Sequence, residues 1–394
     1  MCDVPALRFP EFNGEWITRP IKDIADFIGG GTPSSANEAY WQGTIPWVSS
    51  SDIVEDNIND ITISRYITEE AISNSATKLC SAPVILIVSR VGVGKVALSS
   101  KAICTSQDFC NLINIKVHPT FLAYSLSQIM KRKSIEVQGT SIKGITSLEI
   151  QKIILHIPSL QEQHKISDLF QLIDKRIAVQ SKIIEKYESL IQAIIYKAKM
   201  DGISKGTWRR IDLCKVLQER NEKNVDGRTI CSVSVSQGVV NQIEYLGRSF
   251  AAKQTSHYNV VKYGDIVYTK SPTGDFPYGI IKRSDIREDV AVSPLYGVYI
   301  PASDSIGVIL HFYFMRPSNA FNYLHPLIQK GAKNTINITN GRFLKNSVPL
   351  PISKSEANTI AGILKTIQAK IEIEKNLLLS YTNEKEYLLR QMFI

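Results

Sequence analysis

The sequence predicts an α+β fold arranged as a pseudo-two-fold tandem repeat, in which two β-rich globular domains are separated by two long antiparallel coiled-coil helices. Two observations lead to this prediction. An apolar stripe with a seven-residue period follows Pro158, and a second stripe in the same phase lies 194 positions later, as Ile166 and Ile360 show. Each stripe is preceded by about 140 residues of mixed pattern, which open with Trp16 or Trp208.

The first stripe is typical of a coiled-coil seam, because its apolar residues alternate steps of four and three. Neither Pro nor Gly interrupts it between Ser159 and Met200, and Gly202 is the expected helix stop. The polar Gln180 occupies one position of the stripe. The predicted seam residues are Ile166, Phe170, Ile173, Ile177, Ile184, Tyr187, Ile191 and Ile194.

The second stripe keeps the register of the first, with Glu374 and Lys385 as its two polar positions. Two unrelated surface helices are the alternative. The agreement of period, phase and the preceding prolines, Pro158 and Pro351, favours a duplicated unit instead. The seam residues predicted here are Ile360, Leu364, Ile367, Ile371, Leu378, Tyr381 and Leu388.

These features divide the chain into four segments. We expect a first globular domain in residues 1–157, a spacer helix in 158–205, a second globular domain in 206–351 and a second spacer helix in 352–394. The duplication also suggests that the lead-in 7–12 packs near the end of the C-terminal helix.

Both globular domains are predicted to be β-rich, with a later helix in each. Short β-branched runs predict strands at 45–49, 84–90, 111–117 and 266–270, and helices are expected at 120–133 and 305–316. Weak internal matches align the two copies. Val88-Ser89-Arg90 corresponds to Tyr268-Thr269-Lys270, and Thr105-Ser106 corresponds to Val292-Ser293.

The composition of the 394-residue chain is typical of a folded protein, with 44% hydrophobic and 21% charged residues. The six cysteines have no metal-ligand spacing, so we expect reduced thiols, no metal site and a cytoplasmic location. The N-terminus lacks a signal-peptide pattern, and no apolar run is long enough to span a membrane.

The net charge of +9 is unevenly distributed. Residues 206–351 carry 18 basic and 11 acidic side chains, whereas residues 1–157 carry 14 and 15. A basic domain suggests a polyanionic partner. It is weak evidence alone, and any contact of the first domain with DNA would have to be local.

No motif indicates catalysis or nucleotide binding. The glycine-rich stretch Arg90-Val-Gly-Val-Gly-Lys95 does not match a phosphate-binding loop. It predicts a tight turn between strands, with the alternative that its backbone and Arg90 or Lys95 approach DNA. The stretch 29–35, which is rich in Gly and Ser, is expected to be a mobile loop.

The chain resembles the specificity subunits of Type I restriction-modification systems over essentially its whole length. The most specific carrier is Pro158-Ser-Leu-Gln-Glu-Gln-His-Lys-Ile166 at the start of the first helix. Others are Leu-Arg-Phe-Pro-Glu-Phe before Trp16, the stretch 45–53, and Gly-Asp-Ile-Val at 264–267. The second helix entry, 351–360, has an extra residue and lacks Glu-Gln.

The resemblance implies two target-recognition domains that each read one half of a split double-stranded DNA site. It also implies helices that hold these domains apart and dock two methyltransferase subunits, through which restriction subunits join. Catalysis, with S-adenosylmethionine, ATP and Mg as cofactors, would belong to those partners, so this chain is expected to have neither a cofactor nor a catalytic residue. The 32 steps from residue 166 to 198 span about 48 Å of helix, on the order of 14 base pairs.

Candidate DNA contacts can be chosen only by residue type and by position outside the apolar strands. Hydroxyl, amide and cationic side chains suit phosphate and base-edge contacts. The chosen set is Ser50, Ser51, Arg90, Lys143, Lys270, Thr273, Lys333 and Asn334.

Three other functions remain open at this stage. A stand-alone two-headed DNA-binding regulator would select a split site without partners. A scaffold unrelated to DNA would show no salt-dependent DNA affinity. An enzyme with an unrecognised site is disfavoured by the missing motifs.

Overall fold

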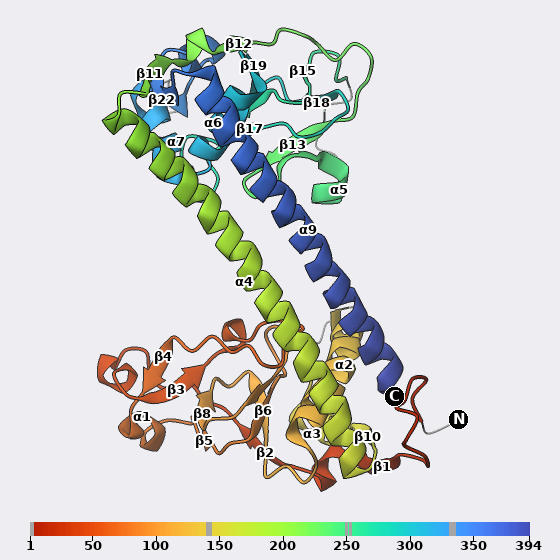
Figure 1. Cartoon of the computed structure of the whole chain (residues 1–394). Helices are drawn as coiled ribbons and strands as arrows, with labels where there is room; N and C mark the ends of the chain where they lie inside the picture. Colours follow the sequence, from red (N-terminus) through yellow and green to blue (C-terminus); the bar gives the residue numbers. More distant parts are fainter. Residues whose placement is uncertain (1–3, 139–143, 249–250, 252–253, 331–335) are drawn as a thin grey trace. The chain divides into compact units, whose positions relative to one another are not determined.

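The computed structural model describes residues 4–138, 144–248, 251, 254–330 and 336–394 (Figure 1). The chain divides into two compact units. Unit 1 comprises residues 1–180 with 377–394, and unit 2 comprises residues 181–376. Because each of the two long helices contributes to both units, each unit combines one mixed α/β block with a segment of both helices.

The two long helices are α4 (Leu160–Ser204, 45 residues) and α9 (Lys354–Met392, 39 residues). Both begin after a proline, and each first turn is capped by a serine hydroxyl. The Ser159 hydroxyl accepts from the backbone N–H of Glu162 at 3.3 Å, and Ser353 does the same for Glu356 at 3.5 Å. The predicted α+β class with two long helices is confirmed.

The predicted stop at Gly202 is wrong, because α4 continues to Ser204. Gly202 is buried inside the helix, and a Cβ at this position would overlap the indole of Trp208. The glycine therefore permits close packing of helix on tryptophan. The chain leaves the helical direction at Gly206, whose φ is +71°.

The block of unit 1 contains ten strands and three α-helices among its described residues. Its strands are β1 (Ile17–Pro20), β2 (Asp26–Gly29), β3 (Ile45–Val48), β4 (Arg65–Ile67), β5 (Leu79–Cys80), β6 (Val84–Val88), β7 (Val96–Ser99), β8 (Ile103–Thr105), β9 (Phe109–Ile113) and β10 (Ile154–Ile157). Its helices are α1 (Glu69–Ser73), α2 (Pro119–Gln138) and α3 (Ser147–Gln151).

The block of unit 2 follows the same plan. Its described strands are β11 (Trp208–Asp212), β12 (Leu217–Glu219), β13 (Cys231–Ser234), β14 (Gly238–Asn241), β15 (Asn259–Val261), β16 (Ile266–Tyr268), β17 (Ile281–Arg283), β18 (Val290–Val292), β19 (Gly297–Pro301), β20 (Gln329–Lys330), β21 (Ile336–Asn337) and β22 (Ser347–Pro351). Its helices are α5 (Gln242–Leu246), α6 (Asp304–Phe314), α7 (Pro317–Leu324) and α8 (Asn340–Phe343).

Sheet topology shows the tandem repeat directly. One four-stranded sheet has the order β2-β9-β6-β7 in unit 1, and its counterpart in unit 2 has the order β12-β19-β16-β17. The antiparallel pair β1-β10 is likewise matched by β11-β22. Val88 ends β6 as Tyr268 ends β16, so the predicted alignment of these two segments is confirmed. Each block therefore repeats the same connections with different side chains.

One predicted strand was misplaced. The run 111–117 was expected to be extended, whereas β9 occupies Phe109–Ile113. Asn114 takes a left-handed conformation with φ +50°, which ends the strand. The helices expected at 120–133 and 305–316 correspond to α2 and α6.

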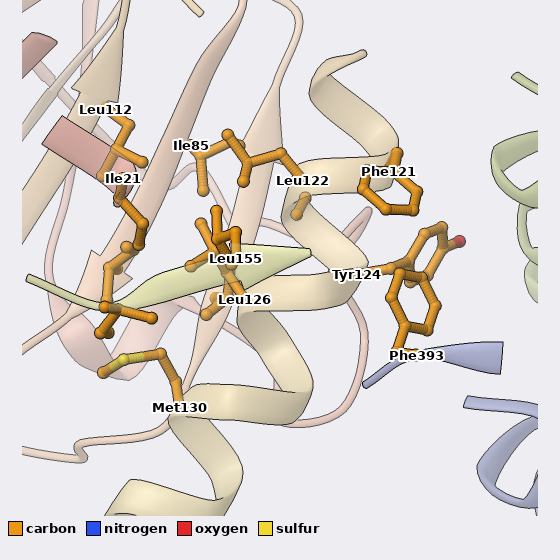
Figure 2. Packing of buried hydrophobic residues seen from close by; sticks show 14 of the residues in the cluster. Ile21, Ile85, Leu112, Phe121, Leu122, Tyr124, Leu126, Met130, Leu155 and Phe393 are labelled. Atoms are coloured by element: carbon orange, nitrogen blue, oxygen red, sulfur yellow. The ribbon is translucent and has the colours of Figure 1, made fainter. Parts of the chain in front are cut away.

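The main core of unit 1 joins the sheet, α2 and both long helices. Figure 2 shows Leu122 and Leu126 of α2 on the side of Ile85, and Phe121 on the side of Phe393. The Phe393 ring lies 5.3 Å from that of Phe121 and 5.8 Å from that of Phe170 on α4. The helix ends are thereby part of the same core as the block.

Within unit 1, α4 and α9 run antiparallel. Asp174 forms an ion pair with Lys385 at 2.7 Å, and Arg176 lies over the Tyr381 ring at 5.1 Å. Buried seam residues of this unit are Ile166 and Phe170, and partly buried ones are Ile173, Ile177, Leu378, Tyr381 and Leu388.

In unit 2, Lys375 of α9 reaches Glu188 of α4 at 3.7 Å. Buried seam residues there are Ile184, Ile191, Ile360, Leu364, Ile367 and Ile371, and partly buried ones are Tyr187 and Ile194. Ile195 is more deeply buried than Ile194. A straight helix drifts by about 20° per heptad, which moves the buried face by one residue near the helix end.

The N-terminal lead-in packs on the end of α9, as the duplication suggested. The backbone N–H of Leu7 donates to the Gln391 carbonyl at 2.9 Å. Arg8 forms two 2.7 Å hydrogen bonds to the fully buried carboxylate of Glu162. Removal of Arg8 would leave a buried carboxylate without its counter-ion, so the lead-in is an integral part of unit 1.

A circular permutant opened between Ser204 and Lys205, with residues 1 and 394 joined by a flexible linker, should fold. The lead-in and the end of α9 already lie in hydrogen-bond contact at Leu7 and Gln391, and chain ends that lie together usually permit such a rearrangement. Circular dichroism should show one cooperative transition within a few degrees of the parent. A permutant opened inside α2, after Tyr124, is the control that should fail. Loss of folding in the first permutant would contradict the contact between the lead-in and the end of α9.

Lys282 on β17 is 3% exposed, and burial lowers its pKa from 10.5 to about 8. The unfolded chain therefore binds more protons than the folded chain between pH 8 and 10.5, so stability should rise with pH in that window. Lys282→Met removes this dependence. The stability advantage of Lys282→Met over the parent should shrink by about 2 kcal/mol from pH 7.5 to 10, as measured by urea unfolding. A pH-independent difference would contradict this explanation.

Candidate nucleic-acid interface

Three loops of unit 1 meet at one edge of its sheets. Strands β3 and β8 are parallel, with Val48 paired to Thr105, so their C-terminal ends coincide. The N–H of Ser106 donates to the Val48 carbonyl at 2.9 Å, and the N–H of Ser89, just after β6, donates to the Asp108 carbonyl at 2.8 Å. We call residues 49–53, 89–95 and 106–108 the unit 1 edge.

The loop containing Ser50 and Ser51 is braced from within. Ser50–Asp52 forms a 3₁₀ turn, and the Asp52 carboxylate accepts from the Ser49 N–H at 2.7 Å and pairs with Arg65. The Ser50 carbonyl accepts from Lys95 Nζ at 3.4 Å. The exposed Ser51 hydroxyl lies 2.9 Å from that of Ser49.

Arg90 sits on a turn whose base is fixed. The Ser89 carbonyl accepts from the Ile145 N–H at 2.8 Å, and Gly92 and Gly94 supply φ angles of +84° and +110°. Arg90 itself is exposed, and among the described residues its side chain has no hydrogen-bond or ion-pair partner. Lys95 differs, since its ammonium donates to the Ile53 carbonyl at 3.0 Å and holds the turn.

Lys270 occupies the equivalent place in unit 2. It lies two residues after Tyr268, the end of β16, as Arg90 lies two residues after Val88. It is partly buried, which lowers its pKa, while Glu219 acts in the opposite sense. Within the described part of the chain, its ammonium has no hydrogen-bond partner. The repeat thus places one unpaired cation at the same edge of each block.

Thr273 is exposed in the loop after β16. We call residues 269–279 of this loop, together with residues 293–296 after β18, the unit 2 edge. Two backbone hydrogen bonds between Thr273 and Phe276, of 3.1 and 2.9 Å, close a tight turn. At the return of this loop, Gly279 has φ +98°, and a Cβ there would overlap the Thr269 carbonyl. The loop has a defined conformation that presents Thr273 outward.

Two exposed residues at these edges were missed from sequence. Gln107 lies in the turn between β8 and β9, beside Asp108, whose carbonyl accepts from the Ser89 N–H. Leu295 lies in the turn between β18 and β19, which the Tyr296 N–H closes by donating to the Ser293 carbonyl at 3.0 Å. The predicted match of Thr105-Ser106 with Val292-Ser293 pointed to these two turns, because both follow directly after the matched residues.

Much of the positive charge of unit 2 is neutralised internally. Arg220 binds the buried Asp265 at 2.6 Å, and this hydrogen bond raises the pKa of Arg220. Arg228 lies 3.0 Å from Asp226, and Lys262 lies 3.1 Å from Glu222. The charge excess that suggested a polyanionic partner therefore overstates the available cations, and the unpaired ones at the edges carry more weight.

Comparison with known proteins identifies this architecture. Residues 13–189 match the family model for the Type I restriction modification DNA specificity domain. The Type I restriction enzyme MjaIX specificity subunit of Methanocaldococcus jannaschii is 32% identical over 184 residues, which are 44% of this chain and 41% of the relative. Residues 13–189 are thus similar to a Type I restriction-modification DNA specificity domain, and the curated relative that they resemble is a specificity subunit.

Two further proteins are similar to this chain. The EcoR124I/EcoR124II specificity subunit of Escherichia coli is 28% identical over 210 residues, 47% of this chain and 50% of the relative. The crystal structure of a Type I restriction-modification system S subunit from M. genitalium has the same fold, with a TM-score of 0.60, 14% identity and 99% of both chains covered. The sequence matches span half or less of the curated relatives.

Three candidate contacts predicted from the sequence are not among the residues that the structure describes. Lys143, Lys333 and Asn334 lie outside the described residues. No cluster of three or more His, Cys, Asp or Glu side chains that could hold a metal ion occurs in the described part of the chain. None of its described helices is long and apolar enough to cross a membrane.

The prediction that residues 29–35 form a mobile loop is wrong for its glycines. Gly31 donates its N–H to the Thr105 carbonyl at 2.8 Å, and a Cβ on Gly30 would overlap the Ser106 carbonyl and the Thr105 hydroxyl. These glycines allow the chain that follows β2 to pass close to the loop that carries Gln107. The Thr32 hydroxyl, just beyond them, donates to the Gln107 side-chain oxygen.

Gly30→Ala should therefore destabilise unit 1 by about 1–3 kcal/mol, because backbone atoms would have to move to admit the methyl group. Gly29→Ala is the matched control, since nothing lies within 4 Å of a Cβ there, and it should change stability by less than about 0.5 kcal/mol. Urea unfolding of both variants measures the difference. Equal stability of the two would contradict the packing seen at the unit 1 edge.

Proposed function

We propose that this chain is the DNA sequence-recognition subunit of a Type I restriction-modification complex. The observation that carries the proposal is the match of residues 13–189 to a DNA specificity domain. The equivalent unpaired cations Arg90 and Lys270, each on an exposed loop, support it. Cationic and hydroxyl side chains on loops held by rigid strands are suited to phosphate and base-edge contacts.

In this proposal each globular domain reads one half of a bipartite double-stranded DNA site. The tandem repeat supports it, because both blocks have the same sheet order and carry different loop residues at the same edge. Repeated scaffolds with different loops are expected to select different sequences. The continuous helices α4 and α9 would set the spacing between the half-sites.

We further propose that the chain is not an enzyme and that two methyltransferase subunits dock on its helical region. Adenine methylation with S-adenosylmethionine, and ATP- and Mg-dependent restriction, would be carried out by the methyltransferase and restriction subunits. The support for this part is the family resemblance. Base recognition by this chain would then direct chemistry that happens in its partners.

The electrostatics of the edges favour weak binding by the chain alone. Each phosphate contact releases counterions and contributes about 0.9 to the slope of log affinity against log salt concentration. Among the described residues of the two edges, only Arg90 and Lys270 are cations without a partner, so the edges offer at most two such contacts. Arg220, Arg228 and Lys262 are held by carboxylates. Docked partners that add contacts would therefore raise DNA affinity strongly.

The test is co-purification of the chain with candidate methyltransferase subunits, followed by methylation of a randomised DNA library with S-adenosylmethionine. A stable complex that methylates adenines within one split sequence is the expected result. Selection of a split site by the chain alone, with no partner retained, would instead indicate a stand-alone regulator. If the chain neither retains a partner nor selects DNA, the proposal fails.

A further inference from the structure

We propose that the two edges recognise DNA by different means: Arg90 reads a guanine directly in the half-site of unit 1, whereas Lys270 binds the DNA backbone in the half-site of unit 2. This inference rests on the proposed function and deepens it to single residues. It follows from how each cation is mounted, what surrounds it and which hydrogen bonds its head group can form.

Hydrogen bonds fix the turn that carries Arg90 on both of its sides. Both the N–H and the hydroxyl of the preceding Ser89 donate to the Asp108 carbonyl, at 2.8 and 3.0 Å. Lys95 ties the far side of the same turn to the Ile53 carbonyl at 3.0 Å. A reader of base edges needs this kind of support, since a bidentate contact tolerates only small displacements.

The Arg90 guanidinium is also uncommitted, unlike the other arginine close to this edge. Arg65 pairs with Asp52 and lies 4.5 Å from the centre of the Trp47 ring. The only carboxylate on the facing turn, among the residues the structure describes, is Asp108, which accepts from the Ser106 hydroxyl at 3.1 Å. Among the described residues, none of the five guanidinium N–H donors of Arg90 has a partner.

The neighbours of Arg90 are suited to bases. Val91, the next residue on the turn, is 70% exposed, and Gln107 is exposed in the neighbouring turn of the unit 1 edge, whose Asp108 carbonyl accepts from the Ser89 N–H. The Gln107 side-chain oxygen accepts from Thr32, which orients the amide and leaves its NH₂ group as a donor. An arginine fork for guanine O6 and N7, an amide donor and an aliphatic group for a thymine methyl are the side chains that read the major groove.

Lys270 is placed for a different task. It is partly buried and experiences the charge of Glu219, and Leu295, in the other loop of the unit 2 edge, is 69% exposed. An ammonium is a compact point charge without the planar fork of arginine, so it suits a phosphate better than a bidentate base contact. The residue after it is Ser271, in place of the aliphatic Val91.

The test compares Arg90→Lys, Arg90→Ala and Lys270→Ala in the full-length chain, together with whatever methyltransferase subunits co-purify with it. Lys101→Ala is the matched control, because Lys101 is an exposed cation in the turn between β7 and β8. This turn follows the C-terminal end of β7, whereas the turn that carries Arg90 precedes the N-terminal end of β7. Sequence preference is measured on a randomised double-stranded DNA library, and unfolding temperatures establish that all variants fold.

Arg90→Lys should keep overall affinity within about threefold and lower the preference for guanine at one position of one half-site by about 10-fold or more. Arg90→Ala should lose the same preference and also bind more weakly. Lys270→Ala should weaken binding to all sequences alike and lower the salt slope by about 1. The Lys101→Ala profile should equal that of the parent.

Unchanged base preferences in both Arg90 variants, with the parent still selecting a split site, would overturn this inference and leave the proposed function intact. A uniform loss of affinity in Arg90→Ala, with a lower salt slope, would also overturn it and make Arg90 a phosphate contact. A base-specific loss in Lys270→Ala would overturn the assignment to Lys270. A parent that selects no sequence would overturn both proposals.

Discussion

Each unit depends on one constraint, which is that the apolar stripe of α4 and the apolar stripe of α9 must both be buried. In unit 1, a cluster of polar side chains lies within the buried face of the two helices. Asp174 accepts from Lys385 at 2.7 Å, from the Tyr124 hydroxyl at 2.6 Å and from Asn59 at 2.8 Å. A buried ion pair is tolerated when further hydrogen bonds satisfy its lone pairs. This cluster joins α4, α9 and the block at one point, and so defines how the helix ends and the block fit together within unit 1.

The two copies meet the same structural requirement with different partners. At the start of each long helix a glutamate lies beside the chain segment that enters the block. Glu162 is paired with Arg8 in unit 1, whereas Glu356 accepts from the Trp208 indole N–H at 2.8 Å in unit 2. In unit 1 the equivalent indole nitrogen of Trp16 is buried and has no partner among the described residues. The scaffold has been kept while its local hydrogen bonds have been exchanged.

The same separation between scaffold and detail explains the edges. Strand order and register place Arg90 and Lys270 at equivalent positions, so the block specifies where a contact can be made. The residues around each cation determine which kind of contact with DNA that cation can make. Loops carry this variation because they accept new side chains at little cost to the core, whereas the strands beneath them are almost completely buried.

The sequence by itself determined the repeat, the two long helices and the alignment of Arg90 with Lys270, because heptad periodicity and prolines act over short stretches that can be read locally. Only the tertiary structure decided which residues face one another across the edges. It joined the turn that carries Gln107 to Ser89, bound the Lys95 ammonium to carbonyl groups and packed Gly30 against Ser106. These outcomes depend on strand pairing between segments far apart in the chain, and a local pattern contains no information about that register.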